Sequence, residues 1–539
     1  MKLANNKSKI LCSIVFLIIY ACGLSVYRDY GLTIDDEIYR SNGLLYKNYI
    51  NDFIGSLLNF EIDQIKLIHQ SFQANSLTAH PALFETMLAI ISDVLKLNDS
   101  KKIYEISHLL NFTIYFFSLI ILFKLIRKRC SSYISLLGVL VLFLTPRIFA
   151  ESFYNTRDIF FLSLFIFFLY TIQKIINEHT YKNILYLSIT SALLIITKVL
   201  GIIPFLIFLI LHINNLTENI KNKKNYLKEF FLLIVLTFIF IVILWPYLWV
   251  SPMNSLYLAY TEMIKQHESL TLLNYFFGDQ IISTDIPWYY RIIWFFITTP
   301  IIVILLYILG FISILSNLIK KILNLDEKNL RIFQNEKEFF DGYLLLVIVG
   351  TLFATIKFNE SQYGGWRHLY FLYIPVILFS MQGVNFILKL NKKYLSNIIS
   401  LLIWITLIIN SIWMYNNHPY QNIFFNNIVK KYAKNNFELD YWGLSNLQSL
   451  NHILDNDKNK IIKVSTISFA DLDVSKMKLD KKERKRIKII HNYEESDYLI
   501  DTYMKRIGKN YIINSLKFRK FYEIKVNDIA INTVYKKVE

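Results

Sequence analysis

The sequence predicts a polytopic α-helical membrane protein with a small α/β domain outside the membrane. Of its 539 residues, 54% are apolar and 18% charged, and the mean hydropathy of +0.37 is positive, unlike that of most soluble domains. The apolar residues gather into runs of about 15 to 25, the helix length that crosses ~30 Å of hydrocarbon. A soluble globular enzyme is therefore excluded.

About eleven apolar runs are expected to be transmembrane helices. They cover residues 10–26, 103–123, 133–149, 159–173, 184–197, 199–213, 230–246, 291–316, 342–356, 369–389 and 397–414. The first run follows basic residues, as a secretory signal does, but no small-residue cleavage site follows it. We expect it to be a retained anchor.

Loop charges predict the orientation. Basic residues concentrate in the loops near 124–129, 221–228, 320–331 and 392–393, and such loops stay in the cytoplasm. An odd number of spans then places the N-terminus in the cytoplasm and the tail on the extracytoplasmic side. The net charge of +17 comes from these basic loops and from a general compositional bias, so no nucleic-acid partner is expected. Three scattered cysteines indicate neither a disulfide framework nor a zinc site.

Two predicted extracytoplasmic regions are too long to be connectors. Within a transmembrane domain of residues 1–414, the first loop, 27–102, has apolar residues at helical spacing, which favours helices along the membrane interface. A second large loop covers 246–290. The tail 415–539 has helical patterns near 422–435 and 443–455 and β-type runs at 461–467, 487–490, 498–500 and 521–534, which predicts a small α/β domain.

The sharpest chemical signal is the acidic triplet Asp35-Asp36-Glu37 after the first span. Acids at a membrane surface can accept a proton from an attacking hydroxyl or hold a divalent cation against a phosphate. The alternative is an ordinary helix start, because Thr33-x-x-Asp36 fits a capping box and acids favour helix N-termini.

Further polar residues recur at span ends on the same predicted side. Ionisable groups at such positions usually face a cavity or pair with one another. Local pairing of Arg157 with Asp158, snorkelling of Lys198 and a turn role for His80 are the structural alternatives. The candidates are Arg40, His80, Arg147, Arg157, Asp158, Lys198, Arg367 and His368.

These motifs together resemble the GT-C membrane glycosyltransferases. Within that superfamily, they resemble glycosyltransferase family 39 and the group of bacterial relatives of protein O-mannosyltransferases and of the lipid A aminoarabinose transferase. The resemblance extends over most of the chain. The matching segments are Asp36-Glu37, His80-Pro81, Asn155-Thr156-Arg157-Asp158, Gly365-Trp366-Arg367-His368-Leu369-Tyr370, 418–426 and 438–445.

The resemblance implies inverting transfer of a hexose or pentose from a polyprenyl-phosphate donor to an extracytoplasmic glycan, lipid or protein. Asp36 would be the general base, with Asp35 competing for that role and Glu37 beside them. Arg367, His368, Arg157 and Lys198 would neutralise the donor phosphate, and His80, Asp158 and Arg40 would line the substrate pocket. No cofactor is assigned, and no cluster has convincing metal spacing, although Asp36 and Glu37 could hold a divalent metal with the donor phosphate.

Two other hypotheses belong to different classes. A flippase for lipid-linked saccharides should show internal repeats and polar groups near the bilayer midplane, whereas here the polar groups cluster at span ends. A non-catalytic scaffold would make the acids simple caps. Release of polyprenyl phosphate from a donor would distinguish the transferase from the scaffold.

Overall fold

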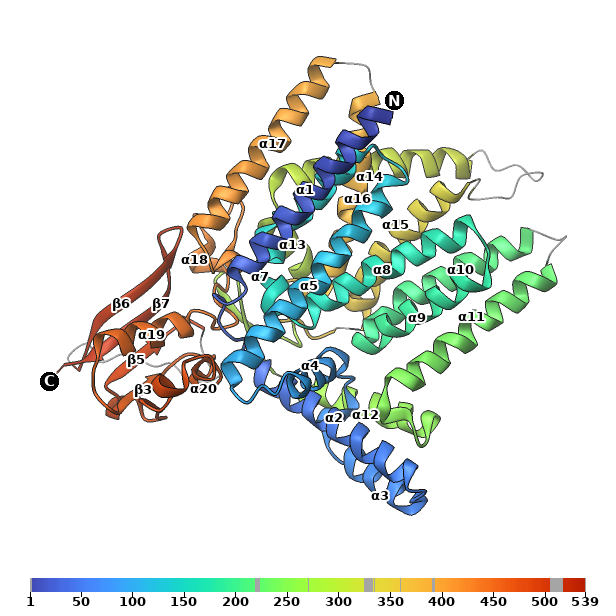
Figure 1. Cartoon of the computed structure of the whole chain (residues 1–539). Helices are drawn as coiled ribbons and strands as arrows, with labels where there is room; N and C mark the ends of the chain where they lie inside the picture. The colour runs from blue at the N-terminus through green and yellow to red at the C-terminus, as the bar shows by residue number, and fades with distance from the viewer. Residues whose placement is uncertain are drawn as a thin grey trace.

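The computed structural model describes residues 2–218, 223–269, 271–323, 333, 335–358, 360–389, 393–504 and 517–538. Within them, eight helices are long and apolar enough to cross a membrane, and they run side by side as a bundle (Figure 1). The predicted polytopic helical class is therefore confirmed. These helices are α1 (Lys2–Val26), α5 (Ser100–Arg127), α8 (Asp158–Asn177), α11 (Lys223–Leu244), α14 (Ile301–Leu323), α15 (Glu336–Lys357), α16 (Tyr373–Lys389) with η5 (Arg367–Leu372) before it, and α17 (Lys393–Asn416).

The expected count of eleven spans is not reproduced by single long helices, although every predicted run is helical. The run 133–149 breaks into α6 (Ser132–Phe143) and α7 (Pro146–Tyr154), bent by 67°. Proline starts α7 because it lacks the N–H that would continue α6. Pro300 likewise separates α13 (Tyr290–Thr298) from α14. Helices α9 (Tyr181–Thr197) and α10 (Ile202–Glu218) are apolar but shorter than the eight long helices. The described residues therefore hold eight spans, or nine if α6 and α7 together count as one.

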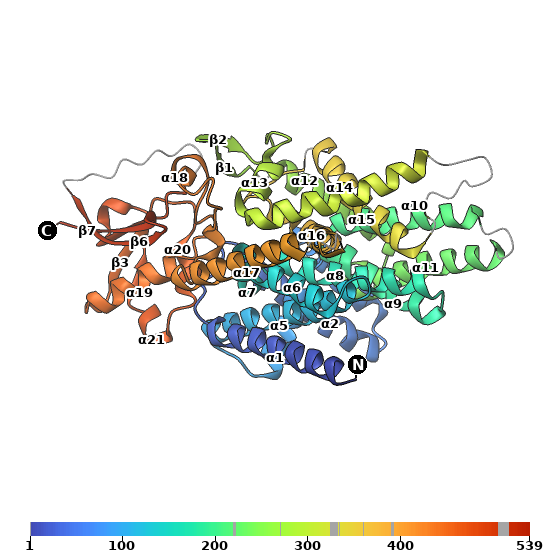
Figure 2. The same ribbon diagram turned by 90° about the horizontal axis from the view of Figure 1, so that it is seen from above.

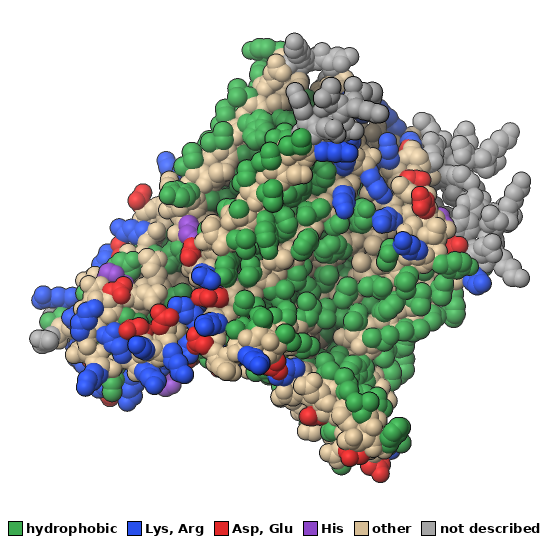
Figure 3. All heavy atoms as spheres, in the orientation of Figure 1, with side chains coloured by type: hydrophobic (Ala, Val, Ile, Leu, Met, Phe, Trp, Pro, Cys, Tyr) green, Lys and Arg blue, Asp and Glu red, His purple; other side chains and the backbone are tan. Residues whose placement is uncertain are grey.

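Burial separates central from peripheral spans. In α8 and in η5–α16, 78% of the apolar window is buried within the protein, against 11% in α1 and α11. Figure 3 shows hydrophobic side chains across the outer face of the bundle, while charged side chains gather over the C-terminal domain. Outward apolar side chains fit contact with lipid. Of the basic loops that predicted the orientation, residues 219–222, 324–332 and 390–392 lie outside the described residues.

The first large loop folds into helices, as predicted. They are α2 (Asp36–Leu58), α3 (Ile62–Gln73), η1 (Ser76–Ala79) and α4 (Leu83–Val94). Helices α2 and α4 pack so closely that a Cβ at Gly43 would lie 2.4 Å from the main-chain oxygen of Glu85. Tyr46 donates a hydrogen bond of 2.6 Å to the carbonyl of Thr78, which fixes η1 against α2.

The second large loop contains a helix and a hairpin. After η4 (Pro246–Leu248) come α12 (Pro252–Ser269) and two antiparallel strands, β1 (Leu273–Phe276) and β2 (Asp279–Ile282). Phe276 forms an isolated antiparallel bridge with Phe437, so the hairpin packs on the start of the C-terminal tail.

The tail forms the predicted α/β domain around a five-stranded sheet of order β4-β3-β5-β7-β6. Strands β3, β4 and β5 are parallel, and β7 is antiparallel to both β5 and β6. The elements are η6 (Gln421–Ile423), α18 (Ala433–Asn436), α19 (Asn446–Asn456), β3 (Ile462–Thr466), α20 (Leu472–Lys476), α21 (Lys481–Arg484), β4 (Ile487–Ile489), η7 (Tyr493–Glu495), β5 (Tyr498–Asp501), β6 (Phe518–Val526) and β7 (Ile529–Lys537). Figure 2 shows this domain at one end of the helical bundle.

One predicted helix of the tail is wrong. The pattern near 422–435 yields only η6 and α18, whereas that near 443–455 is α19. The Asn426 side chain donates to the carbonyls of Phe296 at 2.6 Å and Thr299 at 3.2 Å, where α13 ends. These tertiary hydrogen bonds and the neighbouring buried aromatics hold the segment against the bundle and override its helical periodicity.

Candidate active site

The acidic triplet divides into three different environments at the start of α2. Asp36 is buried, and its Oδ2 accepts a hydrogen bond of 2.5 Å from the main-chain N–H of Thr33. That contact closes the turn before α2, so Asp36 has a structural role, but the N-cap of α2 is Asp35 and the predicted capping box from Thr33 is not formed. Burial raises the pKa of Asp36 to about 7, against the opposing effect of the Thr33 hydrogen bonds. Glu37 is exposed to solvent.

Asp35 is the member of the triplet that faces a cation. Its Oδ2 lies 3.8 Å from Nη2 of Arg367 and accepts a 3.2 Å hydrogen bond from the Tyr39 hydroxyl. Burial raises the pKa of Asp35, and the Arg367 charge opposes that shift. The side chain keeps 24% of its surface exposed, so a substrate hydroxyl can reach it.

Arg367 belongs to a buried charge cluster around Asp158. Nη1 of Arg367 lies 3.2 Å from Oδ2 of Asp158, and Lys198 Nζ is paired with Oδ1 of the same carboxylate. The Asn155 amide donates a third hydrogen bond of 2.8 Å to Asp158. One carboxylate therefore orients two cations.

Aromatic rings fix the Arg367 guanidinium. Its Cζ lies 4.4 Å from the ring centroid of Trp442 and 4.6 Å from that of Tyr363. Arg367 is 2% exposed, yet Nη2 has no hydrogen-bond partner among the described residues. Buried donors are rarely left unpaired, so this N–H group is available to an acceptor on a ligand.

Chain breaks bring the cluster together. Asp158 begins α8, Lys198 lies between α9 and η2 (Val199–Gly201), and Arg367 begins η5. Before Arg367, Gly364 and Gly365 have φ of +68° and +77°, values that glycine adopts without the steric cost of a side chain. The charged residues thus come from span ends, as the sequence indicated.

Arg157 does not pair with its neighbour Asp158. Its Nε donates to Oε1 of Glu85 at 3.0 Å, and its guanidinium covers the Tyr39 ring at 4.5 Å. Arg157 therefore forms the wall beside Asp35 and links α2 to α4. Glu85, which is 5% exposed, was not predicted, because a lone glutamate in an amphipathic helix carries no signal.

The remaining predicted residues lie around this cluster with less direct contacts. The His368 ring packs on Tyr363 with ring centroids 5.0 Å apart. Arg40 covers the Tyr104 ring of α5 at 5.7 Å, and the main-chain carbonyl of His80 accepts a 3.2 Å hydrogen bond from Asn42. Within the described parts of the chain, neither Arg40 nor Glu37 forms a hydrogen bond or an ion pair with Asp158 or Arg367.

No motif indicated Lys478, which the C-terminal domain inserts beside the acidic loop. This lysine is 3% exposed, and its Nζ donates to the carbonyl of Tyr30 and lies 3.3 Å from Nδ1 of His108. Burial lowers the pKa of Lys478 to about 7, with Glu105 and Asp36 acting against that shift. Two ion pairs hold the same interface, Arg484 with Asp99 at 3.1 Å and Lys101 with Asp480 at 2.8 Å, and Nε2 of His418 lies 2.8 Å from Oδ2 of Asp29.

Glu438, another residue whose role the sequence did not indicate, is a buried carboxylate near the cluster. It is 4% exposed, and the main-chain N–H groups of Gly365 and Tyr275 act on its carboxylate. Burial raises the pKa of Glu438 to about 7, while the charge of Arg147 partly opposes the shift.

This raised pKa predicts how stability changes with pH. The unfolded chain releases the Glu438 proton near pH 4.3, whereas the folded protein keeps it to about pH 7, so stability falls as pH rises through this window. We expect Glu438→Gln to match the wild type at pH 4 and to be more stable by about 3 kcal/mol at pH 8. Thermal unfolding in detergent over this range measures the effect. Glu61→Gln, at an exposed carboxylate, is the control, and equal curves for Glu438→Gln and wild type at pH 8 would contradict the assignment.

Metal ligands are not grouped in the described residues. No set of three or more His, Cys, Asp and Glu side chains is placed to hold a metal ion there. Asp36 and Glu37 are the pair that the sequence suggested as metal ligands. Asp36 is buried, whereas Glu37 is exposed.

Comparisons with known proteins agree with the motifs. Residues 80–245, a little under a third of the chain, match the family model of dolichyl-phosphate-mannose-protein mannosyltransferase. This segment includes Glu85, Arg157, Asp158 and Lys198. No curated protein matches the chain.

Several solved structures are similar at low identity. ArnT from Cupriavidus metallidurans bound to undecaprenyl phosphate is 9% identical, with 97% of each chain covered and a TM-score of 0.45. The Archaeoglobus fulgidus oligosaccharyltransferase in complex with Zn and sulfate is 11% identical, with 79% of this chain covered and a TM-score of 0.41. The chain covers 59% of that archaeal protein's length. The family match to residues 80–245 confirms the resemblance to the GT-C membrane glycosyltransferases that the motifs indicated.

Proposed function

We propose that the protein transfers a hexose or pentose from a polyprenyl-phosphate donor to an extracytoplasmic glycan, lipid or protein, with inversion at the anomeric carbon. The proposal rests on one observation. Oδ2 of Asp35 lies 3.8 Å from Nη2 of Arg367, and Nη1 of the same arginine binds Asp158. One cluster thus holds a carboxylate that can accept the proton of an acceptor hydroxyl and a buried cation that can stabilise a leaving phosphate.

In the proposed reaction, Asp35 accepts the proton of the acceptor hydroxyl. The acceptor oxygen attacks the anomeric carbon while the bond from that carbon to the phosphate oxygen breaks, and its electron pair stays on the phosphate. Arg367 and Lys198 stabilise the charge that develops there. Because a lipid phosphate is a good leaving group, the reaction needs a base and cations more than a strong general acid.

Asp35 replaces Asp36 as our proposed base. The Asp36 carboxylate accepts from the Thr33 main chain, whereas the Asp35 carboxylate is part-exposed and faces Arg367. We assign no metal to the reaction. The proposed location is the bacterial inner membrane, with the N-terminus in the cytoplasm and the acidic loop and C-terminal domain outside.

Mass-spectrometric profiling of membrane glycolipids and glycoproteins from a deletion strain tests this function. We expect one hexose or pentose to disappear and only the wild-type gene, not Asp35→Asn, to restore it. The modified molecule would also identify the acceptor. Accumulation of a lipid-linked precursor, with full complementation by Asp35→Asn, would instead favour a flippase and contradict the proposal.

A further inference from the structure

The loop that leads into the acidic triplet is buried although it has no regular secondary structure. Residues 30–33 are four consecutive buried positions between α1 and α2. Main-chain groups in such a loop need hydrogen-bond partners from other segments, because no helix or strand supplies them. The C-terminal tail covers this loop, and the Tyr30 hydroxyl donates to Oε1 of Gln421 in that tail at 3.1 Å.

Lys478 of the C-terminal domain supplies the partner for a main-chain group of this loop. Its side chain is 3% exposed, and its Nζ donates to the carbonyl of Tyr30. Nζ also lies 3.3 Å from Nδ1 of His108, and the same ring nitrogen lies 3.1 Å from the carbonyl of Tyr27. A buried carbonyl without a donor is unfavourable, so the main-chain path of the loop depends on this lysine.

Apolar packing holds the loop against the same domain. The Leu32 side chain is buried in a small cluster with Tyr104 of α5 and Val474 of α20. A Cβ at Gly31 would overlap the main-chain oxygen of Leu444, so the close approach of the two segments requires glycine. The loop and the domain thus contact each other through packing as well as through hydrogen bonds.

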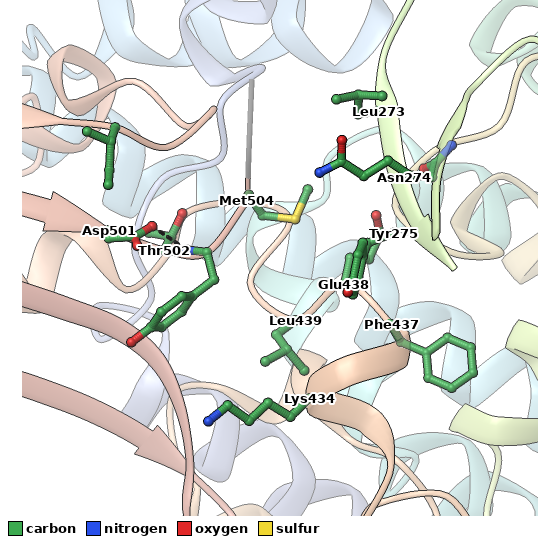
Figure 4. Close-up of a pocket in the computed structure, with 13 residues that line it drawn as sticks. Leu273, Asn274, Tyr275, Lys434, Phe437, Glu438, Leu439, Asp501, Thr502 and Met504 are labelled. Atoms are coloured by element: carbon green, nitrogen blue, oxygen red, sulfur yellow. Dashed lines mark hydrogen bonds between the residues drawn. The ribbon is translucent and has the colours of Figure 1, made fainter. Parts of the chain in front are cut away.

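The contact of the domain with the second large loop is looser. A cavity of about 240 Å³ lies between them, and Figure 4 shows Asn274 and Tyr275 of β1 on one side of it and Asp501 and Thr502 at the end of β5 on the other. At Gly31, in contrast, there is no room for a methyl group. The domain therefore has a cavity on the side of the second loop and a close fit on the side of the acidic loop.

The segment 441–444 contacts both sides of the charge pair. Two of its aromatic rings cover the Arg367 guanidinium at 4.4 and 5.8 Å. Its last residue touches Gly31, four residues before Asp35. The 3.8 Å distance between Asp35 and Arg367 therefore depends on the C-terminal domain from both sides.

We propose that the C-terminal domain positions the base for catalysis, with Lys478 as the positioning residue. By holding the carbonyl of Tyr30, Lys478 fixes the loop that places Asp35 beside Arg367. The domain is then part of the catalytic machinery and not a separate appendage. This inference rests on the proposed function, to which it adds a residue that acts through Asp35 without touching a substrate.

Sugar-transfer kinetics of full-length variants in membranes test this role. The acceptor probe is the total glycolipid and glycan extract of the deletion strain, and the donor is a polyprenyl-phosphate sugar. We expect Lys478→Met to lower the maximal rate about 10²-fold and to leave both half-saturating amounts unchanged, because a displaced base slows the chemical step without weakening binding. Lys101→Met is the matched control. It removes the part-exposed ion pair with Asp480 at the same interface and should lower the rate less than about twofold.

A second variant disturbs the same contact from the side of the loop. Gly31→Ala places a methyl group against the main chain of Leu444, so it should lower the maximal rate as Lys478→Met does. Gly55→Ala is its control, because a Cβ at Gly55 in α2 would meet no atom within 4 Å. This control should transfer sugar at the wild-type rate.

Hydrogen exchange separates the positioning role from the catalytic proposal. The N–H groups of Thr33 and Asp36 are hydrogen-bonded within the loop. In purified protein in detergent, Lys478→Met should speed their exchange about tenfold, while β3 and β5 exchange as in the wild type. If the wild type transfers no sugar but exchange in the loop still depends on Lys478, only the proposed function fails.

Unchanged exchange at Thr33 and Asp36, or equally faster exchange in β3 and β5, would overturn the positioning role. So would an equal loss of rate in Lys101→Met, a normal rate in Gly31→Ala, or a rise in a half-saturating amount with an unchanged maximal rate.

Discussion

Replacing Asp35 with asparagine is expected to lower sugar transfer by about 10²- to 10⁴-fold, the usual contribution of a general base. Asparagine keeps the shape of the side chain and can still accept from Tyr39, so the loop should stay folded. It cannot accept the proton that the acceptor hydroxyl must lose. Transfer to extracted acceptor, divided by the amount of inserted protein, gives the measurement.

Asp36→Asn is the matched control for this experiment. Its side-chain oxygen can still accept from the N–H of Thr33, and it is not the residue we propose as the base, so we expect a loss of less than about tenfold. Full activity of Asp35→Asn together with an inactive Asp36→Asn would reverse the assignment and return the base to Asp36.

The second large effect is expected at Arg367. Arg367→Lys keeps one positive charge beside Asp158 but loses the planar fork that reaches both Asp158 and Asp35. We expect transfer to fall by about 10²- to 10³-fold, the cost of removing one donor that stabilises developing charge. Maximal rate should fall more than donor affinity, because the charge on the phosphate grows in the transition state.

Arg129→Lys controls for the loss of a buried arginine pair. Arg129, which follows α5, contacts Asp341 of α15 with a 2.6 Å hydrogen bond through Nη2. The two substitutions disrupt comparable ion pairs, so they should lower thermal stability alike. Activity per folded molecule should fall only in the Arg367 variant, and a similar fall in both would make Arg367 a structural residue.

Several features of the fold could be read from the sequence because they depend on composition and local periodicity. Long apolar runs must form helices in lipid, since their main-chain groups find no other partner there. The hydrophobic spacing of 27–102 likewise predicted helices correctly, and the β-type runs of the tail predicted strands correctly. The number of spans did not follow, because the breaks at Pro146 and Pro300 divide apolar runs that look continuous, and α9 and α10 are shorter than the other spans.

For the active site, the sequence determined which acidic and basic residues lie at the ends of the spans, and these residues could be identified from it. Only the tertiary structure decided their partners. Arg157 pairs with Glu85 rather than Asp158, Asp35 rather than Asp36 faces Arg367, and Lys478 reaches the acidic loop from a domain more than 400 residues away. The physical reason is that pairing depends on the direction of each side chain and on the packing of distant segments, which local sequence does not encode.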